Sequence, residues 1–285
     1  MSQKLSRYSF SGHESFQCKS LWLKKGYDYL ANGHSFNDLD AVAKLGVGKN
    51  MVASIRFWLR AFGMTKADEL QTISSFIFDS ENGVDPYVED INTLWVLHFL
   101  LVSSEVASLY HLLFVDYQRK KKEFRKTDLL SFIKRKCSVP EQRNVYNENT
   151  VRKDIGVLTK NYVAPSDLKT IEDFSALLIA LGSIVSKDHE VYSFKTHEKK
   201  DVAPEVILFA LIRMKGGDRT VSFDILQKLS LIFGLTMTNL IETIGDLEAK
   251  FPDTLVFTDN SGIKNVQFIR EINEFDALNH YYQSL

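Results

Sequence analysis

Three pairs of amphipathic helices constrain the fold of this 285-residue chain most. The first pair lies in FNDLDAVAKLGVGKNMVASIRFWLRAFGM, residues 36–64, where Asp38 is expected to cap the first helix. That helix carries Leu39, Val42, Ala43 and Leu45. The GVG break is followed by a helix expected from about Lys49 to Phe62. Its apolar stripe consists of Val52, Ile55, Leu59 and Phe62. This spacing predicts a helix-turn-helix, and a plain helical hairpin is the alternative.

The other two pairs repeat the arrangement. FRKTDLLSFIKRKC and NENTVRKDIGVLTKNYV form the second pair, and the third lies in SFDILQKLSLIFGLTMTNLIETIGDLEAKF. The stretch DTLVFTDNSGIKNVQFIR then predicts two strands around a D-N-S-G turn, and a similar turn is expected at DSENG, residues 79–83. We therefore predict a mainly α fold with small β-hairpins and multiple winged-helix or helix-turn-helix-like units. The predicted domains are 1–118, 119–200 and 201–285.

Charge is distributed in blocks along the chain. Residues 1–66 carry ten Lys or Arg and four Asp or Glu, for a net +6, and residues 67–118 carry nine acids and no base, for −9. Residues 119–160 have a net charge of +8, and residues 161–285 have −6. Two basic islands in an otherwise acidic protein indicate two contacts with nucleic acid, although solvated charged faces give the same count.

The two basic helices supply the candidate DNA-binding residues. On the helix from Lys49, the cations Lys49, Arg56 and Arg60 lie beside the apolar stripe. Asn50 and Ser54, near the start of the helix, are short polar side chains that could reach base edges. On the helix of the second pair, cations lie opposite Val151, Ile155, Leu158 and Tyr162, which suits phosphate contact. The candidates are Lys49, Asn50, Ser54, Arg56, Arg60, Asn149, Arg152, Lys153 and Lys160. The third pair presents Glu242, Asp246 and Glu248, which indicates a protein-contact or structural role.

Two stretches offer candidate catalytic chemistry. FSGHESF, residues 10–16, contains His13 and Glu14, which could act as a general base and a metal ligand. Docking through Phe10 and Phe16, or contact with the DNA backbone, is the alternative. Before the apolar helix near residue 91, carboxylates cluster around Pro86 and could bind a divalent metal such as Mg²⁺, or could cap the helix. The catalytic candidates are His13, Glu14 and Asp85, and the metal candidates are Glu14, Asp85, Glu89 and Asp90.

Other features bear on the compartment. Cys18 and Cys137 are far apart and have no CxxC partner, so neither a disulfide framework nor a thiolate zinc site is indicated, and a reducing cytoplasm fits. The N-terminus has no apolar signal core, and the weakly charged run 91–115 contains Glu105 and two histidines. We expect that run to be a buried core helix rather than a membrane span, and we expect no membrane partner.

Three segments carry a family resemblance: FSGHESFQCKSLWLKKGYDYL, LGVGKNMVASIRFWLRAFG and DPYVEDINTLWVLHFLL. Together they resemble a bacterial family first catalogued as a domain of unknown function, the B subunit of Ssp-type DNA phosphorothioation systems. The resemblance covers most of the chain and is densest over residues 8–101. It implies a subunit of an antiviral defence operon that nicks one DNA strand, so that a cysteine desulfurase and ATP-hydrolysing partners can place sulfur in the backbone.

The resemblance transfers no catalytic residue position by position, and no PD-(D/E)xK, HNH or GIY-YIG nuclease pattern fits the sequence. The chain is therefore predicted to be a subunit that binds duplex DNA, with nickase activity as the further expectation. A non-enzymatic DNA-binding adaptor or transcriptional regulator is the alternative, and a protein scaffold without DNA contact is a third possibility.

Overall fold

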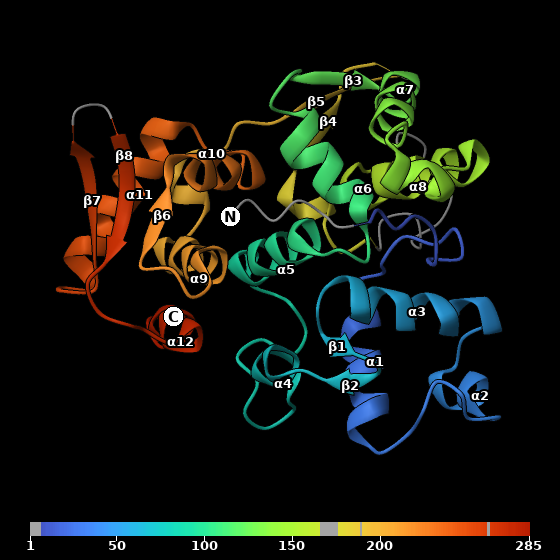
Figure 1. Ribbon diagram of the computed structural model, residues 1–285. Helices are drawn as coiled ribbons and strands as arrows, with labels where there is room; N and C mark the ends of the chain where they lie inside the picture. The colour runs from blue at the N-terminus through green and yellow to red at the C-terminus, as the bar shows by residue number, and fades with distance from the viewer. Residues whose placement is uncertain (1–6, 166–175, 189, 261–262) are drawn as a thin grey trace. The chain divides into compact units, whose positions relative to one another are not determined.

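The computed structural model describes residues 7–165, 176–188, 190–260 and 263–285. The chain forms two compact units, Gln3–Lys195 and Thr196–Leu285. The predicted boundary near residue 118 lies inside the first unit. Helices dominate both units, and the strands form small antiparallel sheets, so the prediction of a mainly α fold with small hairpins is confirmed (Figure 1).

The described part of the first unit begins with four helices and a two-stranded hairpin, and the third of these helices is the longest. They are α1 (Trp22–Ala31), α2 (Ala41–Leu45), α3 (Lys49–Ala61), β1 (Thr65–Lys66), β2 (Glu69–Leu70) and α4 (Thr72–Phe78). Gly46 ends α2 in the left-handed conformation, with a φ of 62°, which glycine adopts at low cost. Gly26 lets α1 approach α3 closely, because a Cβ there would lie 2.7 Å from Leu59 Cδ1. The four residues of the predicted apolar stripe on α3 are all buried.

Two local predictions in this group are wrong. The helix starts at Ala41 rather than just after Asp38, so Leu39 precedes it and is fully exposed. Asp38 instead accepts a hydrogen bond from the Ser35 N–H. The hairpin is formed by β1 and β2 rather than at residues 79–83, where Asp79 accepts hydrogen bonds from following backbone N–H groups in a turn after α4.

The middle of the first unit is a buried helix, α5 (Ile91–Ser103), followed by α6 (Ser108–His111) and a π-helical turn over Leu112–Tyr117. Every residue from Asn92 to Val102 is buried, which confirms a buried core here, but the run expected as one helix over 91–115 is broken after Ser103. Within the described ranges, no single helix is long and apolar enough to cross a membrane. The two segments Ile91–Ser103 and Ser108–Tyr117, which are bent by 100° relative to each other, are long and apolar enough only when they are counted together.

The remaining described elements of the first unit are two helices, two 3-10 turns and the three strands of a small sheet. They are β3 (Glu123–Arg125), α7 (Lys126–Lys136), the 3-10 turn Pro140–Val145, α8 (Glu148–Tyr162), the 3-10 turn Ile179–Leu181, β4 (Ile184–Ser186) and β5 (Val191–Phe194). The strand order is β3-β5-β4, with both pairs antiparallel. The apolar stripe predicted on α8 is fully buried, and α8 packs on α7.

The second unit repeats this connectivity. It contains the 3-10 turn Lys199–Asp201, α9 (Pro204–Lys215), β6 (Thr220–Ser222), α10 (Phe223–Ile232), α11 (Met237–Lys250), β7 (Leu255–Asn260), β8 (Ile263–Phe268) and α12 (Glu274–Tyr282). Its sheet order, β6-β8-β7, corresponds to that of the first unit. The two predicted strands are present, while Ser261 and Gly262 of the predicted turn lie outside the described residues. Buried Glu205 on α9 joins Lys250 of α11 and His280 of α12, each at 2.9 Å.

Candidate nucleic-acid interface

The exposed face of α3 holds only part of the predicted DNA-binding set. Lys49, Asn50 and Arg60 are exposed, and within the described residues neither Lys49 nor Arg60 makes an ion pair. Lys49 is the first residue of the helix after Gly48, so a cation and an amide side chain stand at the N-terminal end of α3. These three side chains can reach a partner in solution.

Two other predicted residues of α3 are occupied inside the protein. Ser54 is fully buried and its hydroxyl donates a 3.1 Å hydrogen bond to the His13 carbonyl, so the expectation that it reads a base edge is wrong. Arg56 is half-buried: its guanidinium forms a two-pronged ion pair with Asp68 and also donates to Asn37. Because Asp68 lies in the β1–β2 turn, Arg56 fixes that hairpin to α3.

The exposed face of α8 carries all four residues predicted for it: Asn149, Arg152, Lys153 and Lys160. Asn147 caps the helix by accepting a 3.0 Å hydrogen bond from the Thr150 N–H. Arg152 pairs with Glu148 one turn earlier, with both side chains about half exposed. Such an exposed pair contributes little to stability and is easily exchanged for another anion. α8 therefore carries three exposed cations on this face, against two on α3.

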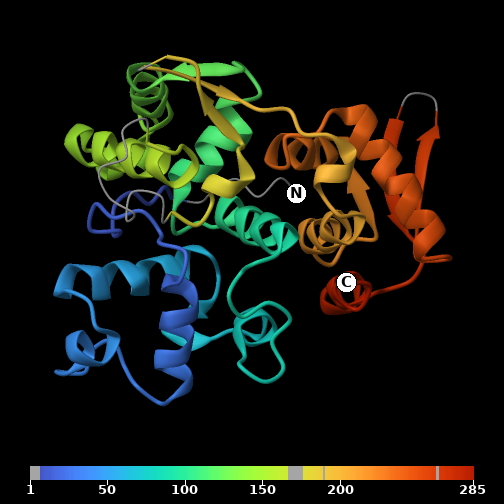
Figure 2. The ribbon, with the colours of Figure 1, turned by 180° about the vertical axis from the view of Figure 1, so that it is seen from behind.

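The N-terminal segment, residues 10–18, joins α3 to α8, and both views of the ribbon show it between them (Figure 1 and Figure 2). On the α8 side, the Ser11 N–H donates to Asp154 Oδ2 at 2.7 Å, and the Cys18 N–H donates to Asn161 Oδ1 at 2.9 Å. On the α3 side, Trp58 Nε1 donates to the Phe16 carbonyl at 3.2 Å, alongside the Ser54 bond. The segment thus fixes one predicted DNA-binding helix against the other.

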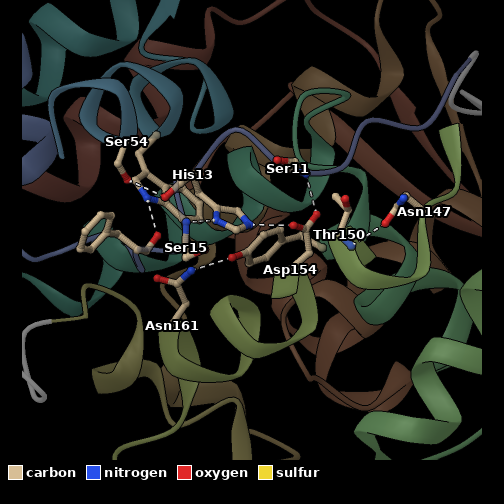
Figure 3. Close-up of polar contacts among 11 residues, drawn as sticks. Ser11, His13, Ser15, Ser54, Asn147, Thr150, Asp154 and Asn161 are labelled. Atoms are coloured by element: carbon tan, nitrogen blue, oxygen red, sulfur yellow. Dashed lines mark hydrogen bonds and ion pairs between the residues drawn. The ribbon is translucent and has the colours of Figure 1, made fainter. Parts of the chain in front are cut away.

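His13 lies at the centre of this connection (Figure 3). Its Nε2 is 2.9 Å from Asp154 Oδ1, and its Nδ1 accepts a 3.1 Å hydrogen bond from the Ser15 N–H. Because Nδ1 accepts, the ring proton of the neutral imidazole lies on Nε2 and is donated to Asp154. His13 is buried against the rings of Phe57 and Trp58, which also contact each other, and Glu14 beside it is exposed. This geometry favours the docking interpretation of FSGHESF over general-base chemistry.

The same segment has an unusual backbone. Ser11, Glu14 and Ser15 all have positive φ values, at 75°, 48° and 65°, and Gly12 has a φ of 107°. A Cβ on Gly12 would lie 2.6 Å from Phe57 Cδ2, so only glycine fits there. Non-glycine residues reach this region at a cost and keep it only where surrounding contacts hold them. The Ser11 bond to Asp154 on α8 and the Ser15 bond to the docked His13 ring supply such contacts.

Two of the four predicted metal ligands, Asp85 and Asp90, have local structural roles. Asp85 is buried, and its two carboxylate oxygens accept hydrogen bonds from the Glu89 and Asp90 N–H groups at 2.9 and 3.0 Å. Asp90 caps α5 by accepting from the Asn92 and Thr93 N–H groups. Across the described part of the chain, no three His, Cys, Asp or Glu side chains form a group able to hold a metal ion. These carboxylates fit helix capping, and metal binding by Glu14 or Glu89 stays a prediction.

Asp154 and Asn161 are the important residues that sequence patterns missed. Both lie on the buried side of α8, and Asn161 also donates to the Tyr110 hydroxyl at 2.6 Å. The available signal was a carboxylate and an amide among the apolar positions of an amphipathic helix. Buried polar groups need partners, so such residues predict a tertiary hydrogen bond even where its partner is unknown.

Comparison with known proteins agrees with this architecture. No curated protein matches the chain. Two crystal structures have a similar fold: a magnesium ion-bound SspB, with a TM-score of 0.82, and an SspB structure, with a TM-score of 0.81. Each is 24% identical in sequence, and each match covers 98% of this chain and 89% of the other. The predicted resemblance is thus confirmed in fold. The sequence profile of one family matches residues 10–282, and the chain therefore belongs to that family, described as "Protein of unknown function (DUF4007)".

Proposed function

We propose that the chain is the DNA-binding subunit of a phosphorothioation system of antiviral defence. The observation that carries this proposal is the pair of exposed cationic faces on α3 and α8, held together by the N-terminal segment within one compact unit. Two linked cationic faces can contact separate stretches of phosphate backbone. The similarity to SspB structures supports the choice of system.

We further propose that the helix and strand groups are winged-helix units. Both three-stranded groups follow the order helix, strand, two helices and a two-stranded hairpin, with the first strand paired to the last. In such units the third helix, here α8 or α11, is the one that commonly enters a DNA groove. The group around α3 has two helices followed by a short hairpin, in agreement with the same proposal.

The second unit is proposed to contact protein partners, which the resemblance suggests are a cysteine desulfurase and ATP-hydrolysing subunits. On α11, Glu242 is exposed, Asp246 pairs with Lys199 at 2.6 Å, and Glu248 accepts a hydrogen bond from the Phe257 N–H. The acidic face repels phosphate. We place the assembly in the cytoplasm, where the two buried free thiols, Cys18 and Cys137, would stay reduced.

Salt-dependent binding to duplex DNA tests the central proposal. The parent should bind more weakly as salt rises, and Lys153→Ala with Lys160→Ala should make the slope of log K against log salt shallower by about 0.9 per lost phosphate contact. The same result is expected for Lys49→Ala with Arg60→Ala. Lys200→Ala removes an exposed cation from the second unit and serves as the control. Salt-independent or undetectable binding by the folded parent would reject the proposal.

We also propose that the subunit nicks one DNA strand. A supercoiled-plasmid assay with and without Mg²⁺ or chelator distinguishes a nickase from a non-enzymatic adaptor. The structural roles of His13 and Asp85 favour an adaptor, whereas exposed Glu14 and Glu89 are free of such roles within the described residues. Glu14→Gln and Glu89→Gln are therefore the informative variants, because capping residues such as Asp90 also affect folding. Metal-dependent nicking lost in either variant supports an enzyme; DNA binding without nicking supports the adaptor.

A further inference from the structure

Gly156 lies in the middle of α8, and no contact inside the described structure requires glycine at this position. Glycine destabilises a helix interior relative to alanine because its backbone loses more freedom on folding. A Cβ at Gly156 would meet no atom of the described structure within 4 Å beyond its chain neighbours and its own helix backbone. Gly12 and Gly26 differ, since a Cβ at either would collide with a side chain. The space over Gly156 is open to the outside of the protein.

The side chains that flank this space are cations. Arg152, Lys153 and Lys160 lie four and three residues before and four residues after Gly156, the spacings at which side chains adjoin on a helix surface. All three are exposed. Lys153 and Lys160 make no ion pair within the described ranges, and Arg152 has only its exposed pair with Glu148. The missing side chain thus leaves a notch in the helix surface with positive charge on both sides along the axis.

We propose that this notch receives a backbone phosphate of duplex DNA, which comes into van der Waals contact with the α8 backbone at Gly156. A phosphate carries a full negative charge and several strong acceptor oxygens, so three cationic donors around one position suit it. The proposal rests on the proposed DNA-binding function and adds a steric requirement to it. General attraction to a cationic helix tolerates a side chain at this position, whereas close contact does not.

The chain provides a matched control for this requirement. Gly245 lies in the middle of α11, and a Cβ there would likewise meet nothing within 4 Å in the described structure. Its helix neighbours include Glu242 and Glu248 instead of cations. Substitution at either glycine should raise the melting temperature, because alanine and glutamine are better helix formers. Only substitution at Gly156 should affect DNA.

The experiment measures duplex DNA affinity and its salt slope for the parent, Gly156→Ala, Gly156→Gln, Gly245→Ala and Gly245→Gln. Gly156→Gln keeps every cation, yet we expect about a tenfold loss of affinity and a slope shallower by about 0.9 for each displaced phosphate contact. Gly156→Ala should show a smaller loss. Lys153→Ala with Lys160→Ala should lower DNA affinity much less in the Gly156→Gln background than in the parent, because the phosphate contact is already lost in that background.

The outcomes separate this inference from the proposed function. Parent-like affinity and slope in Gly156→Gln, with salt-dependent binding by the parent, overturn the notch and leave DNA binding in place. A parent that does not bind duplex DNA rejects the proposed function itself. If Gly156→Gln lowers the melting temperature, Gly156→Ala decides, since the smaller side chain retains the helix. Equal losses at Gly156 and Gly245 also overturn the proposal.

Discussion

Removal of the Asp154 carboxylate tests the connection between the N-terminal segment and α8. The side chains of Asp154 and His13 are each about 7% exposed, and the carboxylate accepts from His13 Nε2 and from the Ser11 N–H. Asp154→Ala leaves two donors without an acceptor, and an unpaired buried donor costs about 1–3 kcal/mol. Ser11 itself is exposed, so water can replace part of its bond. We therefore expect a loss of about 3 kcal/mol, which is a large share of a typical stability of roughly 5–15 kcal/mol.

Urea denaturation followed by circular dichroism measures this loss. Glu148→Ala is the control: it removes a carboxylate from the same helix, but one in an exposed ion pair, and should cost at most about 1 kcal/mol. A cost below about 1 kcal/mol for Asp154→Ala would refute the structural interpretation. A catalytic interpretation predicts a different pattern, in which changes at His13 or Asp154 abolish nicking while stability is retained.

Three further predictions follow from single positions. Burial raises the pKa of Glu205, but the hydrogen bond and charge of Lys250, a backbone hydrogen bond and the hydrogen bond of His280 together lower it by more. The net pKa therefore lies below its ordinary value, and the ionised form stabilises the fold. Glu205→Gln should cost about 1–2 kcal/mol near pH 7, and in denaturation series this difference should vanish as pH falls through the folded-state pKa; a pH-independent difference contradicts it. Gly26→Ala should lower stability by about 1–2 kcal/mol in urea titration because its Cβ would collide with Leu59, and unchanged stability would show that α1 can shift. Asn50→Ala should cost about 1–3 kcal/mol on a cognate duplex and much less on random duplex, and equal losses on both would assign the residue to backbone positioning.

Local periodicity accounts for the parts of the fold that sequence patterns predicted well. The helix expected from Lys49 to Phe62 is Lys49–Ala61 in the structure, and the apolar stripe of α8 is buried throughout. A helix repeats every 3.6 residues, so its buried face is encoded within a few turns. Exposure on the opposite face of α8 follows from the same geometry.

Distant contacts account for the errors. Ser54 lies at a helix position that periodicity alone left available, but the His13 carbonyl, 41 residues away in sequence, covers it. The hairpin was expected at a D-S-E-N-G turn, yet the chain turns earlier, where Ala67 and Asp68 adopt positive φ and Arg56 fixes the turn. The roles of His13 and Asp154 depend on a contact across 141 positions, which no local pattern contains.

The connection between the N-terminal segment and α8 also sets the order in which the protein can fold during synthesis. Its hydrogen bonds from Ser11 to Asp154 and from Cys18 to Asn161 each span 143 positions. At a synthesis rate of about 5–20 residues per second, the segment waits roughly 7–30 s before its partners have been made. The contacts of His13 and Gly12 with Phe57 and Trp58 span only 44 or 45 positions, so the α3 side of the connection can form while α8 is still being made. The segment can therefore dock on α3 first, and Asp154 and Asn161 complete the connection only after α8 has been made.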